Sequence, residues 1–476
     1  NRIIFAIIYY LPMEIWIKAA QLFLSLAILV SLHELGHFIP AKLFKTRIEK
    51  FYLFFNPGFS LFRYKRINGI KKYSWFTKES PKEWKEDEST TEWGIGWLPL
   101  GGYVKIAGMI DESMDKEQLE KPAEPWEFRS KPAWQRLIVM IGGVVVNLLL
   151  GFFIYIMVLF VWGSEYLPNE NAVYGTHLTD SSMSNYGLFE GDQIISADGV
   201  LSEKFGDINQ MIVIDGARNL KVLRNNEEKQ ITLPQGIVDT ILSKKLKGIV
   251  SGPRYPNVVK ELIDTLPAIK AGLQVGDSII EINGLPCSFL LDFQKEMQNH
   301  KSQEINLGFY RNNEKMNLSV MVTENGTIGY YQKSPDDLLS FKTQEYGLME
   351  AIPAGISEGT ETLSNYVKSM SLLFTKEGVK QIGGFGTIGG IFPGTWDWKR
   401  FWLLTAFLSI ILAFMNILPI PALDGGHVVF LIYEMISGKP PSENFLTKAQ
   451  VVGMVLLLTL LVYANGMDIY RWISGA

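Results

Sequence analysis

Four apolar stretches of the chain are long enough to cross a bilayer, which takes about 20 residues in a helix. Residues 1–11 are also apolar, but Pro12 separates them from the first stretch, and we expect them to form a separate interfacial piece. The pattern predicts a multi-pass α-helical membrane protein with four transmembrane helices. The four stretches run from about Ile15 to Ile39, from Trp134 to Gly163, from Phe401 to Ile420 and from Val451 to Gly466.

The basic residues predict how these helices are oriented. Cytoplasmic loops next to membrane spans are enriched in Lys and Arg. In this chain, most of the basic residues close to a span lie in the segment between the first two spans. We therefore expect residues 41–132 in the cytoplasm and the long region 165–400 on the opposite side of the membrane. Lys399 and Arg400, at the outer end of the third span, weaken this assignment. The basic residues that support it are Lys42, Lys45, Arg47, Lys50, Arg63, Lys65, Arg66, Lys71, Lys72, Arg129, Lys131 and Arg136.

The cytoplasmic segment changes character along its length. Residues 64–92 are polar, and we interpret them as a solvated surface loop, with docking of a partner as the alternative. Residues 93–109 are apolar with Gly and Pro at intervals, which is typical of strands and hairpins. Because unpaired backbone cannot face lipid, such a strand needs a pairing partner from the chain or from a bound peptide.

The outer region contains an internal repeat. The segment from Tyr186 to Val200, "YGLFEGDQIISADGV", resembles the segment from Ala271 to Leu285, "AGLQVGDSIIEINGL". Five residues recur in register 85 positions later, which predicts two tandem domains of similar size. The recurring residues are Gly187, Gly191, Asp192, Ile195 and Gly199, then Gly272, Gly276, Asp277, Ile280 and Gly284.

Composition narrows the chemistry. Hydrophobic residues make up 47% of the chain, which suits membrane helices combined with water-facing domains. The net charge is -4 and there is no long basic stripe, so nucleic-acid binding is not expected. Cys287 is the only cysteine, which excludes an internal disulfide and a cysteine-based zinc site. A metal would have to be held by His and carboxylate side chains.

The sequence "HELGH", from His33 to His37, fits the pattern HExxH within the first span. Two His four residues apart share one face of a helix and can bind one zinc ion, with Glu34 placed to activate a water molecule. Ionisable residues inside a span are costly and usually functional. The pattern therefore predicts a catalytic Zn²⁺ site.

Such a site needs a third protein ligand and an open position. His177 and His300 lie in the outer region, on the wrong side of the membrane, and no convincing helix carries Glu49. The segment "NILPIPALDGGH", Asn416 to His427, holds both Asp424 and His427 after the third span. Chemistry alone leaves both open as the third ligand.

Several motifs, taken in order, resemble the site-2 proteases, specifically the bacterial RseP-like branch with two PDZ domains. The likeness extends over nearly the whole chain, and the pair of HExxH and LDG elements is specific. Besides HELGH, the motifs are "PLGGYVKI" at 99–106, "FRSKPAWQR" at 128–136, "GGVVVN" at 142–147 and "NILPIPALDGG" at 416–426.

The resemblance implies roles for individual residues. Asp424 is implied as the third zinc ligand, with His427 not a ligand, and Asn416 is implied to contact the substrate. The segment from Leu100 to Ile106 is implied to be an edge strand that binds an unwound substrate helix by strand addition. Its implied substrate-binding residues are Gly101, Gly102, Tyr103 and Val104.

The resemblance also implies a domain layout. Residues 1–40 form an N-terminal segment and the HELGH helix, 41–132 the cytoplasmic loop with a membrane-associated β segment, and 133–163 the second span. PDZ-like domains at 168–250 and 251–336 are implied to filter substrates by size, with capture of peptide tails the less favoured role. A Gly-rich or amphipathic linker (337–399), a third span with the LDGG motif (400–427), and a loop with the fourth span (428–476) follow.

The expected fold is thus four transmembrane helices, a membrane-associated β-hairpin or sheet, and two extracytoplasmic α+β PDZ domains in the bacterial inner membrane. The expected function is an intramembrane zinc metalloprotease of regulated intramembrane proteolysis. It would cut membrane-anchored proteins with a single transmembrane helix, of the anti-sigma-factor type, or signal-peptide remnants. The alternatives are a catalytically silent membrane PDZ scaffold and a soluble zinc protease with apolar core helices; the intact motif argues against the first and the four spans against the second.

Overall fold

The computed structural model describes residues 13–87, 89–99, 101–109 and 122–474. The expected interfacial piece at 1–11 and the strand residue Leu100 therefore lie outside the described residues. The chain divides into two compact units. One unit combines Asn1–Gly163 with Glu345–Ala476, and the other is Ser164–Gln344.

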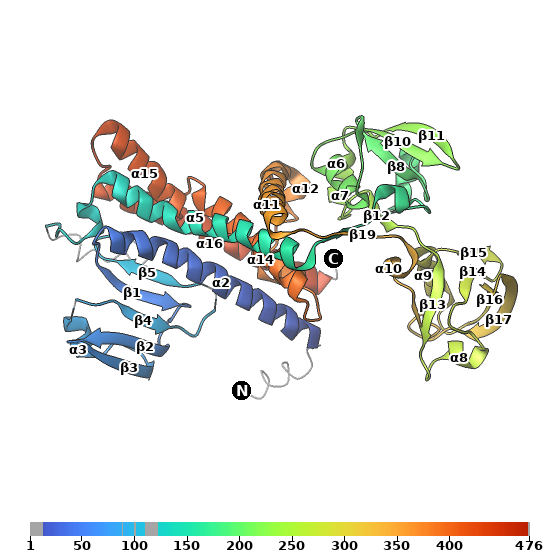
Figure 1. The fold of residues 1–476 in the computed structure, drawn as a ribbon, viewed down its shortest axis with the longest axis horizontal. Coiled ribbons are helices and arrows are strands. Elements are labelled where there is room, and N and C mark those ends of the chain that lie inside the picture. The colour runs from blue at the N-terminus through green and yellow to red at the C-terminus, as the bar shows by residue number, and fades with distance from the viewer. Residues whose placement is uncertain (1–12, 88, 100, 110–121, 475–476) are drawn as a thin grey trace. The chain divides into compact units, whose positions relative to one another are not determined.

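The first unit contains four helices that are long and apolar enough to cross a membrane. Helix α5 packs along both α2 and α14 (Figure 1). Each helix contains or closely matches one of the expected spans, and the first and fourth extend beyond their apolar stretches into polar flanks. The helices are α2 (Met13–Leu43), α5 (Ala133–Trp162), α14 (Trp398–Ile417) and α16 (Glu443–Ser474).

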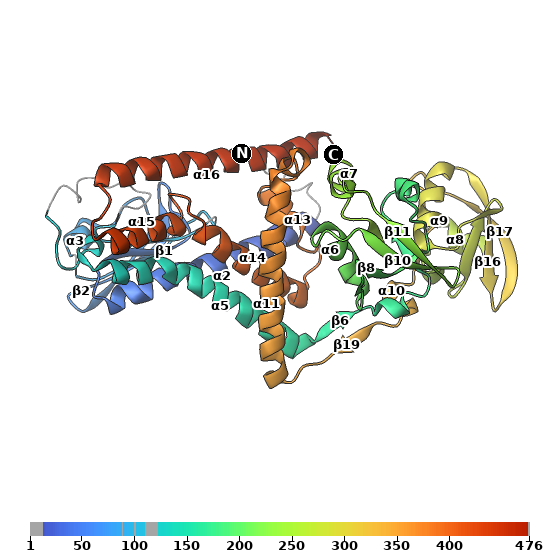
Figure 2. The same ribbon diagram turned by 90° about the horizontal axis from the view of Figure 1, so that it is seen from above.

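Two segments that we expected to be a linker and a loop contain further helices. The linker 337–399 holds the 23-residue helix α11 (Leu348–Met370), which runs across α5 in Figure 2. It packs closely because Gly355 and Gly359 of α11 lie against Ile156 and Phe152 of α5. The loop after the third span holds α15 (Asp424–Ser437). The Gly-rich stretch before α14 holds the short helices α12 (Lys376–Val379) and α13 (Phe385–Gly390).

Helices α2 and α5 cross at glycines. A Cβ atom on Gly36 would lie 2.4 Å from the carbonyl oxygen of Gly142, and one on Gly142 would lie 2.0 Å from that of Gly36. Real side chains cannot approach backbone this closely, so the two backbones meet only because both residues lack a Cβ atom. Small residues are the usual means of close helix approach in membranes.

A five-stranded sheet lies beside α2, in the order β3-β2-β4-β1-β5. Strand β1 pairs in parallel with β4 and antiparallel with β5, so β5 is an edge strand. Phe38 of α2 packs on Phe51 of β1 and Trp93 of β4, which joins the sheet to the helix. The strands are β1 (Ile48–Leu53), β2 (Ser60–Ile67), β3 (Ile70–Thr77), β4 (Glu92–Ile95) and β5 (Tyr103–Ile106).

The interpretation of residues 64–92 as a loop was wrong. Most of the segment belongs to the β2–β3 hairpin and the short helix α3 (Lys82–Glu86). The sequence did not predict these strands because some of their buried residues are polar. Arg63 pairs with Glu92 at 3.1 Å, and both are almost fully buried. Ser80 and Tyr52 also donate hydrogen bonds to this carboxylate. An internally paired polar network thus replaces the apolar side chains that a strand prediction looks for.

The second unit contains two similarly built domains. The first includes a four-stranded sheet in the order β11-β10-β8-β9, and the second a larger sheet that contains β17-β16-β14-β13-β18. The first has β6 (Ser164–Tyr166), β7 (Thr176–Leu178), β8 (Gln193–Ala197), β9 (Val200–Leu201), α6 (Ile208–Val213), β10 (Asn219–Arg224), β11 (Glu227–Thr232), α7 (Ile237–Ser243) and β12 (Val250–Pro253). The second has β13 (Asn257–Leu262), α8 (Pro267–Ala271), β14 (Ser278–Ile282), β15 (Leu285–Pro286), α9 (Leu290–Met297), β16 (Glu304–Arg311), β17 (Glu314–Met321), β18 (Tyr330–Gln332) and α10 (Pro335–Leu338). Strand β19 (Lys342–Gln344), at the end of the unit, pairs with β6.

The aspartate that recurs in the sequence has the same environment in both domains. Asp192 is buried, and its carboxylate accepts two hydrogen bonds from Arg224, at 2.6 and 2.7 Å. Asp277 is buried in the same way and accepts from Arg311 at 2.8 and 2.6 Å. A buried carboxylate requires such a partner, which explains why the Asp recurs with an Arg on the facing strand.

The helix crossing gives a first prediction. Gly142→Ala should destabilise the protein by about 1–3 kcal/mol, the usual cost of forcing extra atoms into a packed interior. Gly466→Ala in α16 is the matched control, because nothing lies within 4 Å of its would-be Cβ atom. Thermal unfolding of the detergent-solubilised protein measures both. Equal unfolding temperatures for the two variants would contradict the crossing.

Candidate metal centre

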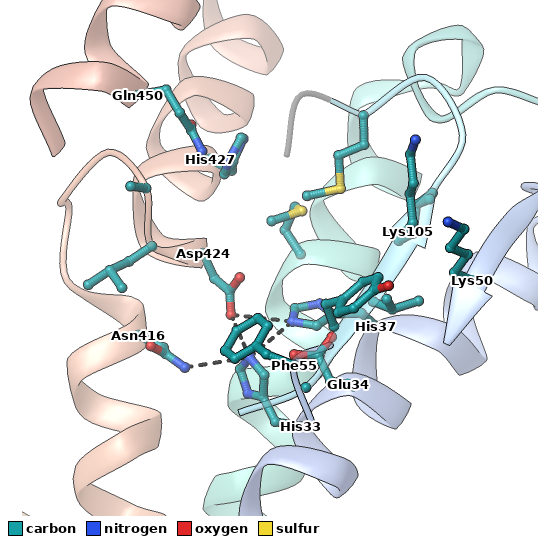
Figure 3. Close-up of a pocket in the computed structure, with 18 residues that line it drawn as sticks. His33, Glu34, His37, Lys50, Phe55, Lys105, Asn416, Asp424, His427 and Gln450 are labelled. Carbon is teal, nitrogen blue, oxygen red and sulfur yellow. Dashed lines mark hydrogen bonds and ion pairs between the residues drawn. The ribbon is translucent and has the colours of Figure 1, made fainter. Parts of the chain in front are cut away.

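The two motif histidines lie on one face of α2 and converge on the same point (Figure 3). Their Nε2 atoms are 3.2 Å apart, and their rings meet edge to face at 84°. Both residues are buried. Nδ1 of His37 lies 2.8 Å from the carbonyl oxygen of Val139 on α5. This contact makes Nδ1 the donor, so that Nε2 of His37 presents a free lone pair.

Helix α5 leaves room for these rings through one more glycine. A Cβ atom on Gly143 would lie 2.5 Å from Nε2 of His37 and 2.6 Å from Cε1 of His33. Any side chain at this position would displace both imidazoles. The site therefore depends on α5 as much as on the helix that carries the motif.

Asp424 reaches the histidines from a break between two helices. Helix α14 ends at Ile417, ahead of Pro419 and Pro421, and Asp424 is the first residue of α15. The break folds back tightly over the first turn of α15, since Cβ atoms on Gly425 and Gly426 would lie 2.2 Å and 2.6 Å from backbone carbonyl oxygens. The two glycines of the LDGG motif thus allow the turn that points Asp424 at α2.

The residues present fit a zinc ion. Oδ2 of Asp424 lies 3.2 Å from Nε2 of His33 and 3.4 Å from Nε2 of His37. This oxygen is buried and has no hydrogen-bond partner when both imidazoles present lone pairs. One ligand atom from each residue lies within 4.8 Å of the others. Two imidazole nitrogens and one carboxylate oxygen are a donor set of catalytic zinc sites.

A cavity of about 550 Å³ opens beside these three residues. Glu34 lines it next to the histidines. Asn416 lines it from the end of α14, with its Nδ2 atom 3.5 Å from Nε2 of His33. Gly102 and Tyr103 contribute further wall. Gly101 is not among the lining residues; a Cβ atom at this position would lie 2.7 Å from the ring of Phe55, which does line the cavity.

The other candidate ligands are occupied elsewhere or differently placed. Glu49 lies on β1 and pairs with Arg47 and Lys105. His177 pairs with Glu190 and His300 with Glu296, both within the second unit. His427 lines the cavity beside Gln450 in Figure 3 but is not part of the cluster of ligand atoms.

Sequence reasoning missed the contribution of α5. Val139, Gly143 and Asn147 all contact the motif histidines, and Asn147 brings its Nδ2 atom to 3.3 Å from Nδ1 of His33. The signal was available in "GGVVVN", which places a polar residue four positions after a glycine in an apolar span. Lys50, Lys105 and Gln450 also line the cavity and had no distinguishing pattern.

An HExxH helix and a distant carboxylate that meet among apolar helices define a zinc protease whose site is enclosed by candidate membrane spans. The model of Peptidase family M50 matches residues 62–460, a range that includes Asn416 and Asp424 and begins after HELGH. The chain belongs to this family and is an RseP-like site-2 protease, a zinc metalloprotease.

Curated relatives cover almost the whole chain. The chain is 28% identical over 476 residues to the regulator of sigma E protease of Haemophilus influenzae, covering 94% of this chain and 97% of the relative. It is 26% identical over 482 residues to protease RseP of Yersinia pestis, covering 96% and 100%. To the regulator of sigma-E protease RseP of Escherichia coli it is 25% identical, covering 95% and 98%.

The cavity offers two candidates for the third ligand, which a matched pair of variants separates. Asp424→Ala should weaken zinc binding by more than the roughly 10- to 100-fold that loss of an outer partner of a metal ligand typically costs. His427→Ala, three residues later on the same helix, should bind zinc like the wild type. Competition with a metal chelator, followed by metal analysis, measures both affinities. The reverse pattern would move the third ligand to His427.

Proposed function

We propose that this protein cleaves the membrane-spanning segments of other proteins, with zinc held by His33, His37 and Asp424. The observation that carries the proposal is one cavity that joins three features. It contains the cluster of ligand atoms, the side chain of Glu34 and residues of the β5 strand. The four apolar helices of the same unit put this cavity within reach of a bilayer.

Each proposed chemical role follows from position. Zinc in such a donor set supplies a Lewis acid that polarises a carbonyl and lowers the pKa of water. Glu34 accepts a proton from the attacking water as its oxygen bonds to the peptide carbon. Glu34 then returns the proton to the departing amine nitrogen as the carbon–nitrogen bond breaks.

The substrate would bind as an added strand. Within a helix each peptide bond is hydrogen-bonded and shielded, so a protease must receive it in extended form. Among the described strands, β5 is the last one of the sheet, next to β1, and Gly102, Tyr103 and Val104 line the cavity. An extended segment beside β5 would exchange backbone hydrogen bonds with it while its scissile bond faces Glu34. Asn416, on the opposite side, would hold the reacting peptide through its side-chain amide.

The substrate class follows from the site and the relatives. Proteins named as regulators of sigma E match nearly the whole chain, which supports membrane-anchored substrates of the anti-sigma-factor type, or signal-peptide remnants. We place the protein in the bacterial inner membrane, with the basic segment after α2 in the cytoplasm and the second unit outside it. There the two PDZ-like domains, 168–250 and 251–336, would limit the size of the substrates that reach the site. Capture of peptide tails is the alternative role for these domains.

Removing the proposed base tests the mechanism. Glu34→Gln should lower cleavage of a membrane-anchored reporter by about 10²- to 10⁴-fold, the usual contribution of a general base, while zinc content stays at the wild-type level. Glu14→Gln, on the exposed first turn of the same helix, should cleave normally. Cleavage by Glu34→Gln at the wild-type rate would overturn the mechanism.

The strand edge gives a separate test. Val104→Pro removes a backbone N–H of β5 and blocks an added strand at this point. Reporter cleavage should therefore fall by about tenfold, which is the loss expected when one strong hydrogen bond to the substrate is missing. Val104→Ala keeps the N–H and should retain most activity. Zinc content, measured alongside, should be unchanged in both variants. If the two variants cleave equally well, the substrate does not pair with β5.

A further inference from the structure

One polar residue in α5 has no role in the function proposed above. Asn147 ends the motif "GGVVVN" and is completely buried in a helix whose neighbouring residues are apolar. Polar side chains within a membrane span are costly and usually have a specific partner. The amide of Asn147 lies against the ring of His33, with 3.3 Å between Nδ2 and Nδ1.

The contacts of α5 with the two histidines repeat at a spacing of four residues. Val139 offers its carbonyl oxygen to Nδ1 of His37, Gly143 makes room for both rings, and Asn147 reaches Nδ1 of His33. Residues four apart share a face of a helix, so these three form one stripe. The stripe therefore contacts the ring nitrogens of both histidines that face away from Asp424.

The second ring nitrogen of a metal-ligating His normally donates its proton to an oxygen, which sets the tautomer and the ring orientation. Val139 does this for His37. For His33, an amide nitrogen against Nδ1 would leave two donors facing each other, while Oδ1 of Asn147 has no hydrogen-bond partner. The nitrogen and oxygen of an Asn amide have the same shape, and a half-turn exchanges them. After that turn, Nδ1 of His33 donates to Oδ1 of Asn147.

We propose that Asn147 is a positioning residue that accepts the Nδ1 proton of His33 through its amide oxygen and so holds Nε2 of His33, with its lone pair free, toward the metal. Asn416 cannot do this, because its Nδ2 atom lies 3.5 Å from Nε2 itself, on the ligand side of the ring. The "GGVVVN" motif thus becomes the template against which both imidazoles are set. This inference rests on the proposed function, in which His33 is a zinc ligand.

A matched control lies next to Asn147. The hydroxyl of Ser409, also fully buried, donates to the backbone carbonyl of Asn147 at 2.7 Å. Ser409→Ala therefore removes a buried polar contact between α5 and α14 at the same residue, but leaves the side-chain contact with His33 intact. Any effect of helix packing alone should be seen in this variant as well.

The test compares Asn147→Leu, Asn147→Asp and Ser409→Ala in the full-length, detergent-solubilised protein. We expect Asn147→Leu to weaken zinc binding by about 10- to 100-fold in chelator competition. Asn147→Asp, which keeps an acceptor oxygen at the same place, should stay within a few-fold of the wild type, as should Ser409→Ala. The visible absorption spectrum of the Co²⁺-loaded protein should change for Asn147→Leu only, because the ligand geometry changes only there.

Several results would overturn the role of Asn147. They are wild-type zinc affinity and Co²⁺ spectrum in Asn147→Leu, failure of Asn147→Asp to restore them, or an equal loss in Ser409→Ala. The unfolding temperature of each metal-free variant, compared with the wild type, shows whether a loss of zinc reflects a loss of fold. His33→Ala distinguishes failure of the role of Asn147 from failure of the ligand assignment. Normal zinc binding by this variant would overturn the assignment of His33 as a zinc ligand.

Discussion

The close crossing of α2 and α5 is the constraint on which the rest of the site depends. The two backbones meet at Gly36 and Gly142, and the next residue, Gly143, leaves the space that the two imidazoles occupy. Once the helices are this close, the carbonyl of Val139 and the amide of Asn147 lie at the outer nitrogens of the rings. A larger residue at any of these glycines would separate the helices and turn the histidines away from each other.

The position of the Asp424 carboxylate depends on the break between α14 and α15. If residues 418–423 were helical, α14 and α15 would be one continuous helix, and the position of Asp424 would be set by the axis of α14. The two prolines in this stretch end α14, and the glycines that follow Asp424 let the chain fold back on itself. Inside a membrane such an interruption is tolerated only where protein surrounds it. Gly453 of α16 lies against the carbonyl of Pro421 and is part of that surrounding protein.

In the proposed function, the sheet holds the substrate peptide in extended form, which a metal site alone cannot do. Its core is shared with the helices: Ile48, Ile106 and Val139 are buried in one cluster that links β1, β5 and α5. The neighbouring strands β2 and β4 are also linked by the buried pair of Arg63 and Glu92. A rigid sheet whose last strand borders the cavity is suited to strand addition, because the edge is ordered before a peptide arrives.

The sequence by itself determined the four apolar helices, the repeat in the second unit and the residue types of the metal site, because hydrophobic length, register and HExxH spacing are local properties. The 3.6-residue period of one helix was enough to predict that Glu34, His33 and His37 lie close together. The choice between Asp424 and His427 did not follow from local chemistry, since both lie within three residues of each other and both can bind zinc. Only the tertiary structure brought Asp424 to α2 over some 390 residues of chain, showed a hairpin where residues 64–92 look like a polar loop, and set Asn147 against His33, because each of these depends on contacts between segments far apart in sequence.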